Sequence, residues 1–270
     1  MDRILIGTSG YDYPEWKGVF YPQELKRSEF LEYYATRFNA LELNNTFYSM
    51  PDSNRIQSFI DRSKGKLTFS IKANRLLTHE ISPHWKNASE EYKNALIPAL
   101  ERDLLSAVLF QFPQSFHYTV ENRRYLAELI DEFKEFPVAV EFRNAQWIKD
   151  SVFEGIIKRN ASVVFCDMPE LKHLPNADFN NSVYSKIIGN DFYLRLHGRN
   201  KEAWYAVNEQ DGTNGSARYD YDYSEKELKE FVPVIEEAYH MTKRIQVYFN
   251  NHPNGSGAKN GARLKELLKK

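Results

Sequence analysis

The sequence predicts an α/β fold, and within that class a (β/α)8 TIM-barrel-like single domain over residues 1–270. Short apolar runs of strand length alternate with longer runs of helical periodicity, which is typical of a sheet of parallel strands. Eight strand-like runs occur in a chain of 270 residues, near the ~250 residues typical of this barrel. No linker, low-complexity tract or domain boundary interrupts the alternation. The main alternative is an open doubly wound sheet.

Apolar, often β-branched runs predict the strands, because such side chains suit the buried surface of a parallel sheet. In chain order the strands are expected at 3–7, 40–44, 67–72, 106–112, 138–147, 162–167, 192–197 and 244–249. A loop rich in Gly, Ser, Tyr and Trp follows the first strand, and Pro113 ends the fourth.

Aromatic and leucine residues at helical spacing predict a helix after almost every strand. In chain order the helices are expected at 29–38, 54–62, 90–102, 120–134, 151–159, 225–241 and 259–268. Ser28 could cap the first helix, and Ser224 with Glu227 matches a capping box. Pro98 and Pro233 should bend the helices that contain them.

The connection after the sixth strand is expected to differ from the others. Residues 168–189 include Pro169, Pro175 and the polar run 180–182, none of which suits a helix interior. We therefore predict an irregular connection in place of the helix after strand 6.

Composition excludes several classes of protein. Cys166 is the only cysteine, so an intramolecular disulfide and a cysteine-rich zinc motif are both excluded. No secretory leader and no apolar run of membrane-spanning length is visible, so we expect a cytoplasmic protein without membrane contact. The formal net charge of −1 does not favour a nucleic-acid partner, because binding through phosphate contacts usually requires a basic surplus.

Polar residues recur at the carboxyl ends of the predicted strands, whose amino halves are mostly apolar. In a barrel these ends converge on one mouth, where ligands bind. Glu141 and Arg143 also fall on alternate positions of one strand and so share a face. We expect a binding site that contains Thr8, Glu42, Asn44, Lys72, Gln111, Glu141, Arg143, Asp167, Arg195, His197, Asn250 and Asn251.

The charges of this mouth limit its chemistry. It should hold three cations and three carboxylates, namely Lys72, Arg143, Arg195, Glu42, Glu141 and Asp167, with His197 as a further titratable group. Such a site could bind a phosphate or carboxylate on its basic side while another group moves a proton. It could equally be a self-neutralised ionic lattice, although burying ion pairs costs several kcal/mol of desolvation.

His197 is the predicted general base. It stands two residues from Arg195, whose charge should favour the neutral imidazole. Glu141 or Asp167 would then orient the imidazole or the substrate. Glu141 itself should stay ionised beside Arg143 and be a poor acid.

Aromatic residues crowd the loops around the expected mouth. Four of them are predicted to form its rim: Tyr11, Trp16, Tyr48 and Trp147. These rings could stack on a sugar or a base, or could simply cap the barrel.

No cofactor or metal ion is expected. The turn 7–10 lacks the Lys-Ser/Thr of a P-loop and the spacing of a dinucleotide fingerprint, and no histidine pair has metal-ligand spacing. An oxygen-rich Mg²⁺ or Mn²⁺ site is conceivable, but the three nearby cations argue against it. Cys166, deep in a strand, is expected to be an inert thiol.

Several runs resemble the YecE-like family (domain of unknown function 72) from end to end. The runs with this resemblance are 7–10 with Trp16, 20–22, 42–48, 72–73 with 78–79, 111–113, 141–143 with Trp147, 195–198 and 248–251. The resemblance implies a TIM-barrel-like fold and no established activity. One departure is Tyr11, where that family often has Trp.

Three functions are compatible with these residues. The first is an enzyme acting on an anionic substrate, which bears a phosphate or carboxylate on a sugar or nucleotide, by acid/base chemistry at the barrel mouth. The second is a non-catalytic nucleotide or nucleic-acid binding protein. The third is a divalent-metal-dependent isomerase or endonuclease-like barrel. The first two share the same ligand chemistry, so turnover is what distinguishes them.

Overall fold

A computed structural model describes residues 3–175, 190–205 and 216–269. Eight parallel strands lie at its centre in the spatial order β1-β8-β7-β6-β5-β4-β3-β2. They are β1 Ile4–Thr8, β2 Ala40–Leu43, β3 Thr68–Lys72, β4 Leu105–Gln111, β5 Val138–Glu141, β6 Ser162–Asp167, β7 Asp191–Leu196 and β8 Arg244–Phe249. The predicted (β/α)8 TIM-barrel-like fold is confirmed, and seven of the eight predicted strands are present with their ends shifted by at most one residue. The fifth was predicted too long: β5 ends at Glu141, and a 3-10 turn occupies Ala145–Trp147, where the strand was expected to continue.

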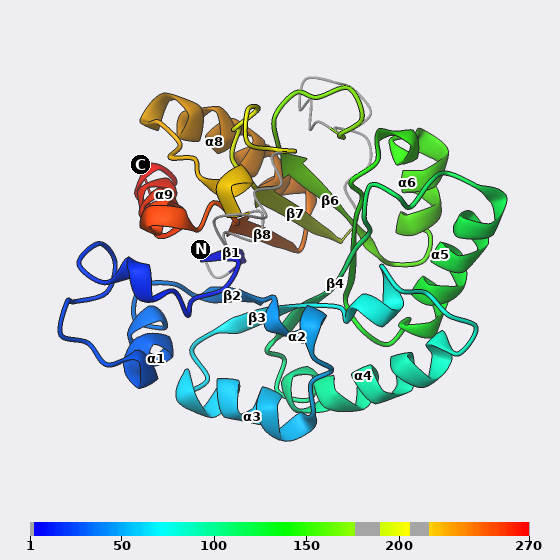
Figure 1. Ribbon diagram of the computed structural model, residues 1–270, viewed down its shortest axis with the longest axis horizontal. Helices are drawn as coiled ribbons and strands as arrows, with labels where there is room; N and C mark the ends of the chain where they lie inside the picture. Colours follow the sequence, from blue (N-terminus) through cyan, green and yellow to red (C-terminus); the bar gives the residue numbers. More distant parts are fainter. Residues whose placement is uncertain (1–2, 176–189, 206–215, 270) are drawn as a thin grey trace.

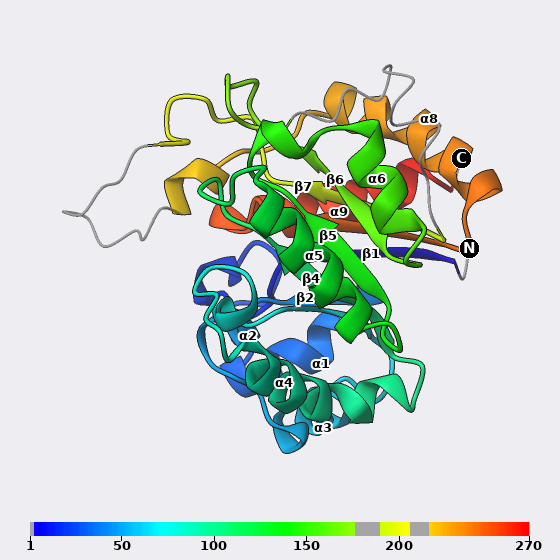
Figure 2. The ribbon, with the colours of Figure 1, turned by 90° about the vertical axis from the view of Figure 1, so that its right-hand side faces the viewer.

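Helices form a layer around the strands, as Figures 1 and 2 show from two directions. They are α1 Phe30–Tyr34, α2 Asn45–Tyr48, α3 Ser53–Arg62, α4 Trp85–Leu100, α5 Val120–Glu132, α6 Asp150–Ile157, α8 Glu225–Met241 and α9 Ser256–Leu267. Short 3-10 turns occur at Pro14–Trp16, Arg27–Glu29, Arg75–Leu77, Ala145–Trp147, Ser216–Tyr219 and Pro253–Gly255. No helix among the described residues is both long and apolar enough to cross a bilayer.

Local capping residues explain where several helices begin. The predicted capping box is present at α8, where Ser224 and Glu227 bond each other's backbone N–H groups. Thr119 caps α5 by accepting the N–H of Asn122. In contrast, α4 begins at Trp85, five residues before the predicted start near 90, and the short α2 was not predicted at all. A four-residue helix has no periodicity that a sequence could reveal.

The irregular connection after β6 is only partly covered by the structure. Residues 168–175 contain no helix, as expected from Pro169 and Pro175. The remainder of that prediction concerns 176–189, which lie outside the described residues.

Side-chain alternation divides the core into two clusters. In β6, Val163 and Phe165 pack outward against the helix layer, whereas Val164 and Cys166 point into the barrel. The barrel interior combines small residues with large ones, such as Ala107 with Tyr248, so that its taper is filled. These packed interior side chains keep the strand ends apart, and the residues of the mouth lie directly above them.

The barrel closes between β1 and β2 largely through side chains. The Tyr34 phenol accepts the N–H of Thr8 at 2.8 Å and donates to the carbonyl of Ala40 at 3.0 Å. Asn39 similarly accepts the N–H of Ile6 and donates to Ile4. These contacts replace ladder bonds that the two strands do not make directly.

Gly7 allows this close approach. A Cβ at position 7 would lie 2.1 Å from the Ala40 carbonyl oxygen, so any larger residue would push β1 away from β2.

We predict that Tyr34→Phe lowers the free energy of unfolding by about 1–3 kcal/mol, because it leaves the Thr8 N–H and the Ala40 carbonyl buried without partners. Urea denaturation followed by circular dichroism measures the change. Tyr33→Phe is the matched control, since the Tyr33 hydroxyl contacts only the exposed Arg37 side chain among the described residues. Equal stability of the two variants would show that the phenol does not close the barrel.

Candidate active site at the barrel mouth

Arg195 on β7 joins two buried carboxylates across the barrel. Its Nη2 donates to Glu42 Oε1 at 2.5 Å, and its Nη1 donates to Glu141 Oε2. The exposed fractions of these three side chains are 2%, 0% and 0%. Ser9 donates to Glu42 Oε1 at 2.5 Å, and Tyr193 donates to Oε2 at 2.8 Å. Strands β1, β2, β5 and β7 are thus tied together by one ionic network.

The network keeps its carboxylate ionised at Glu141. Burial alone would raise the pKa of Glu141, but Arg143 and Arg195 hold that pKa well below its usual range. Burial would likewise lower the pKa of Arg195, yet the two carboxylates hold it well above its usual range. Each charge is therefore stable only in the presence of its partners.

Arg143 and His197 adjoin Glu141 of this network, and of the two only Arg143 reaches the surface. Arg143 Nε is 2.6 Å from Glu141 Oε1 as an ion pair, and the Arg143 side chain is 11% exposed. Its Nη2 is 3.2 and 3.4 Å from the two ring nitrogens of His197, so it favours neither. The residues Glu141, Arg143, Arg195 and His197 thus lie together, as the sequence predicted.

His197 is fully buried and neutral. Asn250 donates to its Nδ1 at 2.9 Å, so the imidazole proton is on Nε2, which is 3.6 Å from Glu141 Oε1. Burial lowers the pKa of His197 well below its usual range, and Arg143 lowers it further. The expected neutral imidazole is present, but Arg143 contributes more to it than Arg195. Because both ring nitrogens face protein groups, the histidine is placed to hold its neighbours rather than to take a proton from a ligand.

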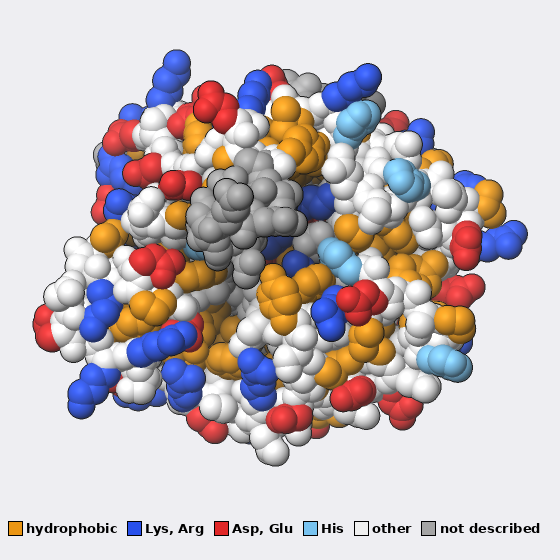
Figure 3. Space-filling model, viewed as in Figure 1, with side chains coloured by type: hydrophobic (Ala, Val, Ile, Leu, Met, Phe, Trp, Pro, Cys, Tyr) orange, Lys and Arg blue, Asp and Glu red, His pale blue; other side chains and the backbone are white. Residues whose placement is uncertain are grey.

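Lys72 is the remaining cation of the mouth. Within the described residues its ammonium has no ion pair and no hydrogen bond, and it lies 4.1 Å from the centre of the Phe47 ring. Burial, with the nearby charges of Arg195 and Arg143, lowers the pKa of Lys72 to about 7 against the opposing effect of Glu141 and Glu42. The side chain is half-buried. Figure 3 shows a hollow near the centre of this face in which Lys and Arg side chains are visible.

Aromatic rings form walls beside these charges, but most are not those predicted. Phe47 packs edge-on against His79 at 4.7 Å, and Arg143 lies 5.9 Å from the ring of Trp204. Burial and the charges of Lys72 and Arg143 lower the pKa of His79 to about 4. Phe47 was not among the four residues predicted to form the rim, although its neighbour Tyr48 on the same short helix α2 was.

The predicted aromatic rim is wrong for three of its four members. Tyr11, Trp16 and Trp147 are 8%, 0% and 1% exposed and belong to the outer core cluster. Trp147, for example, stacks on Phe142 and donates its indole N–H to a backbone carbonyl. Tyr48 is exposed, as a rim residue would be. Large rings in βα loops were needed to cover the barrel, not its mouth.

Asp167 does not join the charged network, contrary to the prediction. It follows Cys166, which points inward, so its own side chain points outward. There it accepts three hydrogen bonds from Arg199, the shortest at 2.9 Å, and one from the Tyr223 hydroxyl at 2.6 Å. Asp167 therefore anchors the loop after β7 instead of orienting His197.

Thr8 and Asn251 are also turned away from the mouth. Thr8 bonds Gly10 and Tyr34 in the seam between β1 and β2. Asn251 bonds Tyr221 and a residue of α9. Both share the outward parity of their strands, and Ser9 has the inward position that the sequence assigned to Thr8. Applying the two-residue alternation to these strand ends would have identified Ser9.

The other predicted ligand-binding residues stand at inward positions of their strand ends. Asn44 follows Glu42 by two residues, and its Oδ1 has no hydrogen-bond partner among the described residues. Gln111 is 9% exposed and donates to the carbonyl of Phe112. Asn250 holds His197 as described above.

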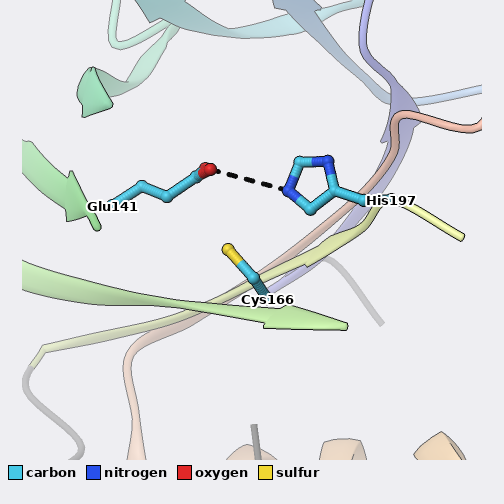
Figure 4. Close-up of side chains that lie close together, drawn as sticks. All are labelled: Glu141, Cys166 and His197. Carbon is cyan, nitrogen blue, oxygen red and sulfur yellow. Dashed lines mark ion pairs between the residues drawn. The ribbon is translucent and has the colours of Figure 1, made fainter. Parts of the chain in front are cut away.

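One group of side chains has the spacing of a metal site. Donor atoms of Glu141, Cys166 and His197 lie within 4.8 Å of one another, and all three are buried (Figure 4). However, Glu141 is already paired with Arg143 and Arg195, and burial raises the pKa of the Cys166 thiol well above its usual range. A cation here would have to displace guanidinium groups and ionise a thiol beside a carboxylate, so the donor set fits a metal ion poorly.

Comparisons with known proteins agree with this architecture. The family model described as "Protein of unknown function DUF72" matches residues 5–270. The UPF0759 protein YunF of Bacillus subtilis is 29% identical, over 98% of this chain and 94% of the relative. The crystal structure of a DUF72 family protein from Thermotoga maritima has a TM-score of 0.85 and 31% identity, and covers 99% of both chains.

More distant structures share the fold alone. A DUF72 family protein from Enterococcus faecalis has a TM-score of 0.82 at 22% identity, covering 99% of this chain and 96% of that one. A D-tagatose 3-epimerase-like protein has a TM-score of 0.55 at 17% identity, covering 98% of this chain and 96% of that one. These likenesses show that the barrel fold is shared.

We predict that Arg195→Met lowers the free energy of unfolding at pH 8 by about 3–5 kcal/mol, because Glu42 and Glu141 stay buried without their shared cation. The loss should be smaller at pH 5, where Glu141, freed of one group that lowers its pKa, can take up a proton. In the unsubstituted protein the low pKa of Glu141 contributes stability above pH ~4.3 that is lost as the pH falls further.

Guanidinium chloride denaturation at the two pH values measures both effects. Arg263→Met is the matched control, since its pairs with Glu225 and Glu266 lie at the surface, and it should change stability little. If Arg195→Met were as stable as this control at pH 8, the network would not support the barrel.

Proposed function

The chain belongs to the DUF72 family, and we propose that it is an enzyme acting on a small anionic substrate, bearing a phosphate or a carboxylate, by acid/base chemistry at the barrel mouth. The observation that carries this proposal is the unpaired Lys72 ammonium beside Arg143. In the described part of the chain no carboxylate neutralises it, although it is half-buried. A group of this kind is stabilised by a bound anion.

Charge balance at the mouth supports an anionic ligand. Arg195 binds both Glu42 and Glu141, and Arg143 binds the second oxygen of Glu141. Two guanidinium groups thus match two carboxylates, and the charge of Lys72 is left over. Asp167, which the sequence counted at this mouth, is paired with Arg199 elsewhere. The site is therefore basic rather than zwitterionic.

Lys72 is also the best placed proton carrier. A general acid or base works best when its pKa is near the working pH, and the pKa of Lys72 is lowered to about 7. In this proposal Lys72 replaces His197, whose ring nitrogens face Asn250 and Glu141. Glu141 and His197 then position Arg143, which binds the anion of the substrate.

The anion site predicts a pH dependence of sulfate affinity. Sulfate keeps its charge between pH 5 and 9, so only the protein titrates. Affinity should be highest below pH ~7, where Lys72 is protonated, and should fall up to tenfold per pH unit above it. Isothermal titration calorimetry with sodium sulfate measures this fall, and proton uptake should accompany binding at pH 8.

Three variants locate the effect. Lys72→Met should bind sulfate weakly at every pH, and Lys72→Arg should bind it without the fall above pH 7. Arg143→Gln should weaken binding by about 10–150-fold, corresponding to one charge-assisted contact of about 1.5–3 kcal/mol. The exposed Arg159→Gln is the control. Affinity that is independent of pH and of Lys72 would reject the anion site.

Catalysis is tested separately from binding. Sugar phosphates and 2-oxo acids are incubated with the protein in D2O, and proton NMR follows loss of C–H signals or formation of product. We expect at least one compound to react, and Lys72→Met to slow that reaction by about 10²–10⁴-fold. Lys66→Met, at an exposed position before β3, should have no effect. Saturable binding without exchange or conversion would instead identify a binding protein.

A further inference from the structure

The backbone of Lys72 is rigidly held, whereas its amine is not. Its carbonyl oxygen accepts hydrogen bonds from Thr46 at 2.6 Å and from the buried Tyr92 hydroxyl at 2.9 Å. The side chain points into the barrel mouth from the end of β3, and its nitrogen lies over the Phe47 ring. No carboxylate of the described chain fixes that nitrogen. A primary amine is thus presented at a fixed place with its reactive atom free.

We infer that Lys72 is a nucleophile that forms an imine with the carbonyl carbon of the substrate, so that the substrate class is an aldehyde, ketone or 2-oxo acid carrying a phosphate or carboxylate. This inference rests on the proposed function and names its substrate class. Amines at the ends of barrel strands are well placed for such chemistry, because ligands enter there.

The surroundings keep a large share of the amine unprotonated. Burial, together with Arg195 and Arg143, lowers the pKa of Lys72 to about 7, while Glu141 and Glu42 oppose the shift. At pH 7 about half of the molecules then carry the neutral amine, against roughly one in 2,500 for a lysine in water with a pKa near 10.4. The neighbouring His79 is itself neutral at this pH, since its pKa is lowered to about 4.

The step balances in atoms and charge. The neutral amine nitrogen bonds to the carbonyl carbon, and the carbonyl oxygen takes one proton from that nitrogen and one from solvent and leaves as water. The product is an iminium that keeps one N–H and a single positive charge. Because that charge replaces the ammonium among Arg143 and Arg195, an anionic group on the substrate is needed to offset it.

Other nucleophiles of the mouth are less suited. The Cys166 thiol is buried, and burial raises its pKa well above the usual range, so it is not a thiolate. The Ser9 hydroxyl donates to Glu42, whose oxygens also bind Arg195 and Tyr193, so it lacks a free base.

Reductive trapping tests the inference. The full chain is incubated at pH 7 with glyoxylate or dihydroxyacetone phosphate and sodium cyanoborohydride, and intact mass and peptide mapping locate the adduct. We expect one equivalent to form at Lys72 up to about 1,000-fold faster than at any exposed lysine, in line with its larger neutral fraction. The rate should rise from pH 6 to pH 8, and excess sulfate should suppress it.

Variants separate this inference from the proposed function. Lys72→Arg should keep sulfate binding and lose the adduct, and Lys66→Met should keep both. Circular dichroism confirms that each variant is folded. Labelling of Lys72 no faster than of Lys66 overturns the imine, and the proposed function then stands if sulfate binding and proton exchange persist. Loss of sulfate binding to the unsubstituted protein would instead overturn the proposed function itself.

Discussion

The guanidinium of Arg195 is the constraint on which the rest of the mouth depends. It is 2% exposed and binds carboxylates from β2 and β5, which lie on either side of the barrel from β7. Such a network is a weak source of stability, because burying its charges costs several kcal/mol for each ion. Its structural effect is geometric. It fixes the strand ends relative to one another, beside the seam where β1 and β2 meet through side chains.

The same network determines which groups remain free for chemistry. Glu42 and Glu141 already bind arginines and hydroxyl groups, so neither can pair with Lys72 or act as a base. His197 is held between Asn250 and Glu141 and is likewise engaged. Among the described residues, the groups left for a ligand include the Lys72 amine, the partly exposed guanidinium of Arg143, the unpartnered Asn44 Oδ1 and the ring of Phe47. That set can bind an anion and move a proton, and offers little to a metal ion.

Sequence reasoning found the fold and most of the network, for a physical reason. Alternation along short strands places Glu141 and Arg143 on one face, and the same rule finds Arg195 and His197. It misplaced Asp167 because Asp167 was assigned to the mouth as a polar residue at a strand end. The inward orientation of its neighbour Cys166, which turns Asp167 outward, was not taken into account. The prediction of the aromatic rim was also largely wrong, because a sequence does not distinguish a ring that covers the barrel from a ring that lines its mouth. The pairing of Arg195, and hence the isolation of Lys72, depends on distances between strands that no sequence pattern encodes.

Burial is the main cause of the low pKa of Lys72, and the network adds to it through Arg195. If Arg195 were absent, only Arg143 would oppose the charges of Glu42 and Glu141 at Lys72, so the ammonium would be favoured more than it is now. Arg195 therefore acts twice, by neutralising the carboxylates that could pair with the amine and by repelling a proton from it. An ionic scaffold of this kind can keep an amine reactive near neutral pH while the amine itself stays open to a ligand. The loss of stability from burying these charges is offset functionally by a reactive amine at the mouth.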